Sequence, residues 1–429
     1  MKHFSLNLET ISPLAIRSDH AQAGADSAGY ISGTALAGSL AAVHRLYFQE
    51  GGEQFEQLFL SGQVQYPDLY PATFKNEGMQ GAINDPIYAL PKTAQSCKRF
   101  PGFFPIKDGD DEEESHGVRD TLLDWAVFEL GSAAKKKETN QPVDVADLLR
   151  PLQTHKQCEC GNPMDHFTGY YRRRSVDEKM MKAEVETRLQ THTGINRETG
   201  TVQEGILYNR RVFNEHTQFW GMVKLPEHLA GPLQDFIDDV GLSGLVRVGT
   251  GRTRGMGKAH LSIAPMEEEQ YSFEAFKKNL QKFNDRLQYA ALQTFPANRF
   301  DLALKPFYFA VTLYSPAILR DSLLRYYGTI NEKTLAKLLD MPDDSFQLVY
   351  QAASTKRVTG WNELWGTPRM NEFAIDTGSV FLFASDVEMN DTLREALFNL
   401  EEKGIGQRKA EGFGRVRISD PFHLEEELR

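Results

Sequence analysis

Two segments of the chain share the same succession of hydrophobic and polar positions. Each begins with apolar residues at the i, i+3, i+4, i+7 spacing of a helix with one buried face. These residues are Leu233, Phe236, Ile237 and Val240 in the first segment, and Leu393, Ala396, Leu397 and Leu400 in the second. A glycine-rich loop follows, at 249–257 and 404–414, and then the alternation of a strand, at 259–263 and 416–419. The pattern predicts helix, glycine loop and strand in both segments.

The beginnings of the two halves also agree. Residues 4–11 alternate between apolar and polar and run into a Ser-Pro step at Ser12, and residues 309–313 do the same before Ser315. Each half is therefore predicted to open with a half-buried strand that ends at a proline. Both exits share the pattern Ser-Pro-x-x-x-Arg, which indicates that the chain arose by internal duplication.

A third glycine-rich element opens the apolar stretch 36–46. Thr34 is a suitable N-cap, so backbone N–H groups at Gly33 to Gly38 could hold a phosphate. The alternative is a helix of small residues packed closely on a sheet.

Two polar, strand-like runs, 184–192 and 206–213, flank a turn at 196–200 with Asn and Gly, which predicts a hairpin. The hairpin could lie along an RNA backbone or form an ordinary sheet edge.

Length and composition narrow the class of protein. A chain of 429 residues with 41% hydrophobic content has room for two or three domains with packed cores. It has no apolar stretch long enough to span a membrane, and it opens with an alternating strand in place of a signal peptide. Three cysteines do not make a disulfide scaffold. We therefore expect a cytoplasmic protein.

Positive charge is concentrated around the glycine loops although the net charge is −11. The first loop region carries Arg247, Arg252, Arg254 and Lys258 without an acid. The second carries Lys403, Arg408, Lys409, Arg415 and Arg417 against Glu411, and residues 170–174 place two tyrosines beside three arginines. Glycine backbones flanked by cations favour phosphate groups. The distribution predicts a dedicated polyanion binder with a local basic track.

The loops do not fit the common nucleotide-binding fingerprints. A dinucleotide site needs strand, G-x-G-x-x-G and helix, whereas here the spacing differs and a strand follows. A Walker A motif fails because Ala259 follows Lys258 and no glycine lies five positions before Gly257. The alternative to a phosphate grip is a pair of glycine-rich turns with solvated arginines.

Cysteine spacing suggests a metal centre in a loop-rich, acidic stretch. Cys97, His116, Cys158 and Cys160 could form a Cys3His zinc site, although His155 or His166 could replace His116. Three unligated thiols are the other possibility. The acidic run 108–114 lacks the ligand order of a calcium loop.

The sequence offers one candidate for catalysis. His20, beside Asp19, could activate a 2′-hydroxyl for metal-independent RNA cleavage. A lone histidine is more often structural, and no paired acids of a polymerase or nuclease are present.

Taken together, these residues resemble the RAMP superfamily of CRISPR-associated proteins. The resemblance rests on the opening strand, the helix start 30–38, the loop 247–257 and the terminal segment 412–416. More narrowly, Cys97, His116 to Asp120, Cys158 to Gly161, 193–197 and 358–362 resemble the large RAMP subunit of type III-D effector complexes. That knuckle is usually C-x-x-C, whereas this chain has C-x-C.

The resemblance implies an α+β fold with two ferredoxin-like (RRM-type) lobes and a zinc-stabilised insertion. We expect a discontinuous first lobe at 1–90 and 171–300, the insertion at 91–170 and the second lobe at 301–429. It also implies a subunit that caps the five-prime handle of a crRNA in an antiviral complex with other Cas subunits, contacting target RNA only indirectly.

The predicted RNA-binding residues lie in the three glycine elements. They are Gly33, Thr34, Gly38, Arg247, Gly249, Gly251, Arg252, Arg254, Gly255, Gly257, Lys258, Arg408, Lys409, Gly412, Gly414 and Arg415. Alternatives to non-catalytic binding are an endoribonuclease that matures precursor crRNA, using His20, and a purely protein-bridging scaffold.

Overall fold

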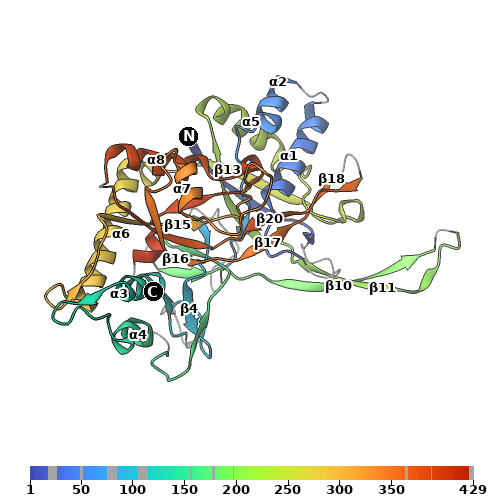
Figure 1. The fold of residues 1–429 in the computed structure, drawn as a ribbon. Helices are drawn as coiled ribbons and strands as arrows, with labels where there is room; N and C mark the ends of the chain where they lie inside the picture. Colours follow the sequence, from blue (N-terminus) through green and yellow to red (C-terminus); the bar gives the residue numbers. More distant parts are fainter. Residues whose placement is uncertain are drawn as a thin grey trace.

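The fold contains two four-stranded sheets with helices packed on them, and its strand pairs are antiparallel (Figure 1). This computed structural model describes residues 1–17, 27–48, 52–74, 85–104, 115–154, 157–175, 179–196, 198–362, 366–387 and 389–424. Within these ranges, no helix combines the length and the apolar character that crossing a membrane requires.

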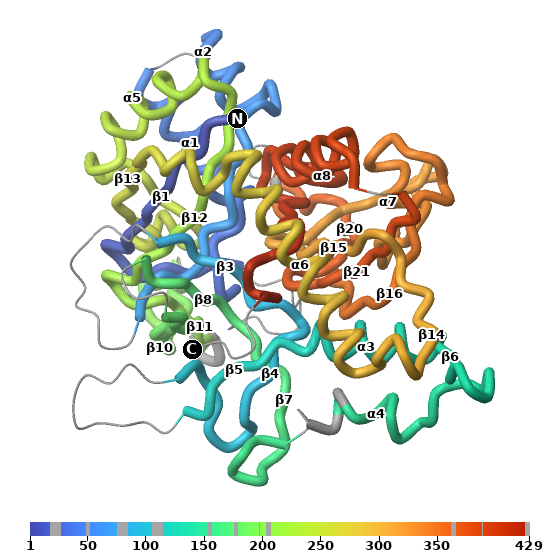
Figure 2. Tube along the Cα trace, turned by 90° about the vertical axis from the view of Figure 1, so that its left-hand side faces the viewer, coloured from blue at the N-terminus to red at the C-terminus, as the bar shows by residue number. Residues whose placement is uncertain are grey.

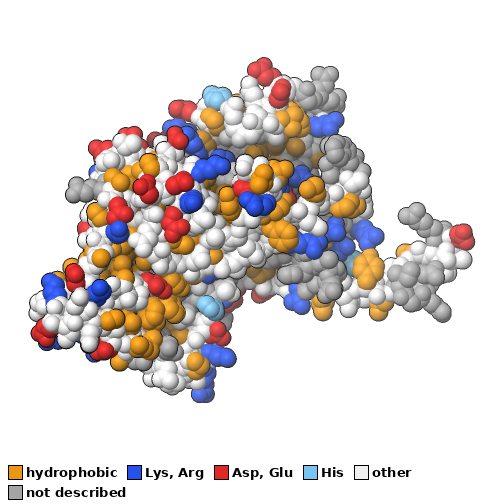
Figure 3. Space-filling view, viewed as in Figure 1, with side chains coloured by type: hydrophobic (Ala, Val, Ile, Leu, Met, Phe, Trp, Pro, Cys, Tyr) orange, Lys and Arg blue, Asp and Glu red, His pale blue; other side chains and the backbone are white. Residues whose placement is uncertain are grey.

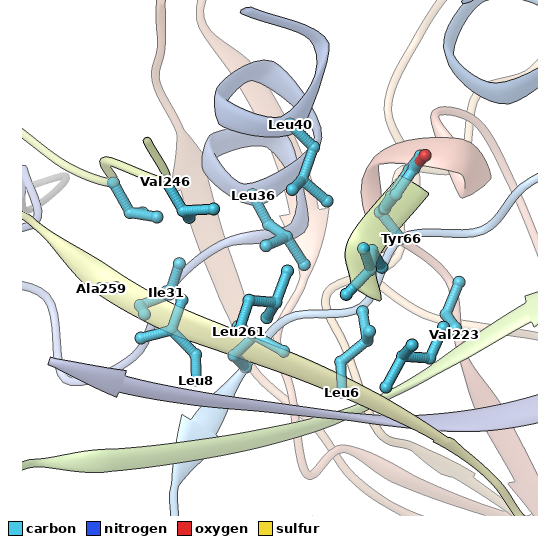
Figure 4. Packing of buried hydrophobic residues seen from close by; sticks show 14 of the residues in the cluster. Leu6, Leu8, Ile31, Leu36, Leu40, Tyr66, Val223, Val246, Ala259 and Leu261 are labelled. Carbon is cyan, nitrogen blue, oxygen red and sulfur yellow. The ribbon is translucent and has the colours of Figure 1, made fainter. Parts of the chain in front are cut away.

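The first sheet and its helices, called the first unit here, follow the order β-α-β-β-α-β. Its elements are β1 (Lys2–Thr10), α1 (Gly33–Phe48), β2 (Tyr70–Pro71), β12 (Gln218–Leu225), α5 (Ala230–Val240) and β13 (Ala259–Pro265). The strands lie in the order β13-β1-β12-β2. Leu6 and Leu8 of β1 pack with Leu36 and Leu40 of α1, as Figure 4 shows. The predicted apolar face of α5 is also buried in this core.

The second unit repeats the same order of elements. It consists of β15 (Phe307–Leu313), α7 (Glu332–Leu338), β16 (Phe346–Ala352), β21 (Val380–Ser385), α8 (Asp391–Lys403) and β22 (Val416–Ile418). Its strand order, β16-β21-β15-β22, is that of the first sheet read from the other edge. The predicted repeat of helix, glycine loop and strand is confirmed in both units.

One prediction about the second unit is wrong. We expected its opening strand to be half-buried, whereas every residue of β15 is buried. Phe309 and Val311 face the core with α8, while Tyr308 and Ala310 lie in a second core on the other face. That second core is formed with α6 (Phe273–Thr294) and α3 (Leu122–Ser132), which cover the sheet on the side that we expected to be exposed.

The cysteine-containing segment lies at the bottom of the molecule, next to the second unit (Figure 2). The strands in and beside this segment form two three-stranded sheets and one two-stranded ribbon. In the first sheet β8 (Tyr170–Arg173) lies between β3 (Ile87–Ala89) and β9 (Met180–Lys182), and in the second β4 (Ala94–Cys97) lies between β5 (Val118–Asp120) and β7 (Met164–His166). The ribbon pairs β6 (Lys135–Lys136) with β14 (Phe300–Asp301). The segment also contains α3 and α4 (Val145–Thr154), so it is more regular than its weak periodicity predicted. A buried chain of Asp120, His423 and Thr312 ties it to the C-terminal turn and to β15, with separations of 2.7 and 2.8 Å.

Two β arms extend from the units. The predicted hairpin is β10 (Thr187–Ile195) with β11 (Val202–Phe213), and it projects far from the body in Figure 1. The second arm is β17 (Thr355–Val358) with β20 (Glu372–Ile375), continued by β18 (Trp361–Asn362) with β19 (Thr367–Pro368). A short α2 (Glu53–Phe55) and a π-helical turn, Glu56–Leu60, follow α1.

A buried charged cluster joins the two units. Nε2 of His3 and Nζ of Lys224, both from the first sheet, lie 3.1 and 3.4 Å from Oε1 of Glu402 on α8. Burial disfavours the charged form of Glu402, but the hydrogen bond from His3 and the charge of Lys224 outweigh it and hold the pKa at about 2. Since breaking a buried pair leaves an uncompensated charge, this cluster strongly couples the units.

We predict that Glu402→Gln lowers the free energy of unfolding at pH 7 by roughly 3–5 kcal/mol. The folded pKa lies below the ordinary value of 4.5, so the contribution is complete above pH 4.5 and is lost as pH falls toward 2. Chemical denaturation at several pH values should therefore show the difference from wild type shrinking between pH 4.5 and 2. The exposed Glu395→Gln on α8 is the control. A difference that stays constant over this range would contradict the assignment.

Candidate nucleic-acid interface and metal centre

The first glycine loop, 249–257, is held against the exit of β1 by backbone hydrogen bonds. The N–H of Thr250 donates to the carbonyl of Ala15 at 2.9 Å, and the N–H of Gly257 donates to the carbonyl of Pro13 at 2.9 Å. The N–H of Val248 closes the loop by donating to the carbonyl of Gly257 at 2.8 Å. The segment that begins with the Ser-Pro step thus provides the carbonyl groups on which the loop packs.

The second loop, 404–414, repeats these contacts at the exit of β15. The N–H of Gln407 donates to the carbonyl of Ile318 at 3.0 Å, and the N–H of Gly414 to that of Pro316 at 2.8 Å. The N–H of Ile405 closes the loop on the carbonyl of Gly414 at 2.8 Å. The correspondence equates Thr250 with Gln407, and it continues through the loop, so that Arg254 corresponds to Glu411.

The two closing glycines are required by close contacts within the loops. A Cβ at Gly257 would lie 2.0 Å from the carbonyl oxygen of Val248, and one at Gly414 would lie 1.8 Å from that of Ile405. Both residues also have positive φ, +77° and +73°, which favours glycine. The sequence argument assigned glycine to close approach of a phosphate, but these two positions approach the protein's own backbone.

Cations of the first loop share a surface with the β10–β11 hairpin. Arg252 and Arg254 lie in a 3₁₀ turn between Gly251 and Gly255, and exposed Arg254 donates to the hydroxyl of Tyr208 on β11. The ring of Tyr208 stacks on His192 of β10, with centroids 5.2 Å apart.

The base of the hairpin also contacts the loop. Nη1 of Arg210 lies 3.5 Å from the hydroxyl of Thr250. Exposed Arg247 precedes the loop and half-buried Lys258 follows it. Lys and Arg side chains gather where the hairpin leaves the body (Figure 3). Tyr208, His192 and Arg210 were not predicted as site residues, although their alternation within 184–192 and 206–213 places them on one face.

The second loop is neutralised internally. Arg408 donates from Nε and Nη2 to Glu411 at 3.0 and 2.8 Å, and from Nη1 to Glu372 at 2.6 Å. Arg369 also donates to Glu411, at 2.9 Å. We call Arg369, Glu372, Arg408 and Glu411 the clasp. Arg408 and Glu372 are 18% and 12% exposed, so their charges are already matched inside the protein.

The predicted helix start of α1 is brought directly against this loop. The N–H of Gly33 donates to Asp68 at 2.8 Å, and the hydroxyl of Thr34 donates to Glu411 at 2.9 Å. Thr34 does not cap the helix as we predicted, because the helix begins at Gly33 and the hydroxyl of Ser32 accepts from the N–H of Ala35. Carboxylates therefore occupy the helix terminus where we expected an RNA phosphate.

Three other predicted RNA-binding residues of this region, Arg415, Lys409 and Gly38, differ in how deeply they are buried. Arg415 reaches between the units and donates to the carbonyls of Met222 and Gln65, and burial lowers the pKa of its guanidinium to about 10. Half-buried Lys409 lies in the 3₁₀ turn closed by Gly412. Gly38 is exposed on α1, with no atom near its missing Cβ.

A second candidate centre is formed by the predicted metal ligands. One ligand atom each from Cys97, His116, Cys158 and Cys160 lies within 4.8 Å of all the others. Sγ of Cys97 is 3.6 Å from Sγ of Cys160, and Nδ1 of His116 is 3.1 Å from Sγ of Cys158. Hydrogen bonds from Asn162 lower the pKa of the Cys160 thiol to about 6, which favours the thiolate form that binds metals.

The local fold explains how these four residues meet. Cys97 ends the central strand β4, and His116 lies two residues before β5, which pairs with β4. The turn that carries Cys158 and Cys160 leads into β7 on the other edge and closes through the N–H of Gly161, whose φ is +78°.

Among the alternative residues, His166 lies exposed on β7 and outside the cluster. His155 and the catalytic candidate His20 lie outside the described residues.

Comparison with known proteins identifies one family. The sequence model described as "RAMP superfamily" matches residues 7–260, which run from within β1 to the start of β13 and include the cysteine segment and the hairpin. No curated protein matches the sequence.

Two solved structures show weaker likeness. A chain of the "Cryo-EM structure of the Type III-B Cmr-beta bound to cognate target RNA" is 12% identical, with 96% of each chain covered and a TM-score of 0.40. The "Crystal structure of oligomeric Cmr4 from Pyrococcus furiosus" is also 12% identical, covering 62% of this chain and 99% of that one, with a TM-score of 0.28. At these TM-scores neither likeness establishes a shared fold.

We predict that Gly257→Ala and Gly414→Ala each destabilise the protein by at least about 2 kcal/mol, because a methyl group would overlap a carbonyl oxygen at a positive φ. Gly38→Ala, in the middle of α1, should instead be neutral or stabilise by up to about 1 kcal/mol. Thermal unfolding of the three variants measures the contrast. Equal melting temperatures for all three would show that the loops tolerate a side chain.

Proposed function

The chain belongs to the RAMP superfamily, and we propose that it is an RNA-binding subunit of a type III-D CRISPR-Cas effector complex that holds the five-prime handle of the crRNA. Other Cas subunits would be its neighbours, and it would contact target RNA indirectly. The type III-D assignment is supported by the segments around Cys97, His116, Cys158 and 358–362, which resemble the large RAMP subunit of those complexes.

One observation carries the RNA-binding proposal. The first glycine loop presents exposed Arg254 beside the stacked rings of Tyr208 and His192, and exposed Arg247 precedes the loop. Cations that neutralise phosphates, next to aromatic faces on which bases stack, are the combination that binds single-stranded RNA. The backbone turns at Gly249, Gly251, Gly255 and Gly257 fix where these cations lie.

At the second loop and at the start of α1, most of the predicted RNA-binding groups already have partners within the protein, so RNA can bind those groups only by displacing the partners. A phosphate that binds at Gly33 must displace Asp68, and one that binds at Thr34 or Arg408 must displace Glu411. A phosphate at Arg415 must displace a backbone carbonyl. Lys409 has no carboxylate partner within the described part of the chain, so a phosphate could reach it without displacing one. We therefore propose the first loop as the main RNA contact and Lys409 as the nearest contribution from the second.

We also propose that each unit is a ferredoxin-like lobe, within 1–90 and 171–300 for the first and 301–429 for the second, with an insertion at 91–170. The shared β-α-β-β-α-β order supports this division. Helix α6 ends the first of these ranges in sequence, yet it packs on the sheet of the second unit. The two lobes therefore share this helix.

We further propose that the cysteine cluster holds a structural zinc ion. Tetrahedral zinc with Zn–S bonds of about 2.3 Å places two sulfur ligands roughly 3.8 Å apart, close to the 3.6 Å between Cys97 and Cys160. Three thiolates and one imidazole complete a four-ligand site, which leaves no open position for substrate. Zinc would supply the cross-link between β4, β5 and the turn before β7.

The RNA-binding proposal predicts that the double substitution Arg252→Ala and Arg254→Ala weakens binding of a crRNA bearing its five-prime handle. Each lost phosphate contact should reduce the slope of log K against log salt by about 0.7. Fluorescence anisotropy of the full chain at several salt concentrations gives both quantities. Lys409→Ala should have a smaller effect in the same direction.

The double substitution Lys333→Ala and Lys337→Ala, at two exposed lysines of α7, is the charge-matched control. The RNA-binding proposal is wrong if the double variant binds crRNA with unchanged affinity and unchanged salt slope. Equal affinity for RNA with and without the handle would remove the handle assignment while leaving RNA binding intact. Site-specific cleavage of precursor RNA in EDTA would instead favour an endoribonuclease.

The zinc proposal predicts about one zinc ion per chain in protein purified without chelator, measured by elemental analysis. Cys97→Ser and His116→Gln should lose the metal and lower the melting temperature, since metal binding contributes to folding. His166→Gln, outside the cluster, should keep both. A wild-type chain without zinc, whose melting temperature is unaffected by chelator, would show that the thiols are unligated.

A further inference from the structure

The second arm carries an exposed tryptophan, Trp361, which has no part in the RNA contact proposed for the first glycine loop. Trp361 is 46% exposed and pairs with Pro368 in the two-residue ladder of β18 and β19. Large aromatic side chains are usually buried, so a ring this exposed at the end of a β arm suggests a contact surface. It lies within 358–362, one of the segments that distinguished the sequence.

An arginine from the other unit approaches this ring. The guanidinium carbon of Arg17 lies 5.8 Å from the centroid of Trp361, within the range of a cation–π contact. Arg17 follows Ala15, whose carbonyl accepts from the N–H of Thr250 in the first glycine loop. The tryptophan of the second unit is thereby placed next to the proposed RNA-binding loop of the first.

The base of the same arm repeats the combination of aromatic and cationic side chains. Arg357 of β17 is directly opposite Phe373 of β20, and both are exposed. Phe373 contacts Tyr326 edge-on, with centroids 5.8 Å apart. From Arg357 to Trp361 is four residues, which spans roughly 13 Å of extended chain.

The charges on this arm favour a polyanion over a protein partner. Glu372 already binds Arg320 through one oxygen and Arg408 through the other. Within the described part of the chain, Arg17 and Arg357 have no carboxylate partner. The surface therefore offers exposed rings with unmatched positive charge, which suits the bases and phosphates of an unpaired strand.

We propose that Trp361, with Arg17 beside it, is a stacking platform for an unpaired base of the bound RNA, and that Arg357 and Phe373 continue this track along the arm. The inference rests on the proposed RNA-binding function and extends it to a site shared by both units. RNA leaving the first glycine loop would cross from Arg17 to the second arm. Its bases must be unpaired, because paired bases are stacked on each other.

The test compares Trp361→Ala and Trp361→Phe in the full chain. Loss of one stacked base should weaken single-stranded RNA binding roughly 5- to 150-fold, while the phenylalanine variant should retain most of the affinity. The salt slope should not change in Trp361→Ala, because no phosphate contact is lost, whereas Arg17→Ala should reduce it by about 0.7. Crosslinking of 4-thiouridine-substituted RNA, followed by mass spectrometry, should identify Trp361.

Two controls separate stacking from a structural role. Met370→Ala, 81% exposed on the same arm, should bind like wild type, and a fully paired RNA should bind Trp361→Ala and wild type equally. Wild-type affinity in Trp361→Ala would overturn the inference. If the melting temperature of that variant were lowered as well, the ring would be assigned to joining the two units. A chain that binds no RNA would overturn the proposed function itself, whereas Trp361-independent binding would leave that function standing.

Discussion

The arrangement of both units depends on a carbonyl group at a strand exit that accepts a hydrogen bond from a glycine-rich loop. In the first unit Pro13 and Ala15 provide these carbonyls, and in the second Pro316 and Ile318 do so. Each loop can lie this close only because Gly249 and Gly406 lack side chains, since a Cβ at these positions would lie 2.4 Å from the carbonyl oxygens of Ala15 and Ile318 respectively. The contact fixes the loop on the edge of its sheet, so the cations of the loop are held on a rigid backbone.

After this shared framework the two copies differ at single positions. Arg254 of the first loop projects to the hairpin, whereas Glu411 at the corresponding place binds Arg408, Arg369 and the start of α1. One acidic residue thus changes the second loop from a basic surface into a contact between the units. The same backbone therefore performs two tasks: one copy presents charge outward and the other fixes the position of its neighbour.

Local patterns predicted the parts of this structure that depend on neighbouring residues in sequence. The apolar faces of α5 and α8, the strands after the glycine loops and the β10–β11 hairpin follow directly from periodicity. The ligand set Cys97, His116, Cys158 and Cys160 also meets as its residue types suggested. These features need little information from the rest of the chain.

Contacts between segments that are distant in the sequence could not be predicted from it. The pairing of Thr34 with Glu411 joins residues 377 positions apart, and no local pattern indicates it. In the same way, the strand β15 alternates as if one face were exposed, and only the packing of α6 and α3 on it shows otherwise. Tyr208 and His192 were missed because a polar strand face gains meaning only when the loop beside it is known.

The enclosure of the clasp has a practical consequence. Added electrolyte weakens attraction between solvent-exposed charges far more than between enclosed ones. Concentrated salt should therefore screen the outward-facing arginines and weaken the proposed RNA contact, while Arg408 and Glu372 hold Glu411 in place against Thr34 of the first unit. Under the proposed function, purification in concentrated salt would yield an RNA-free protein whose two units stay associated.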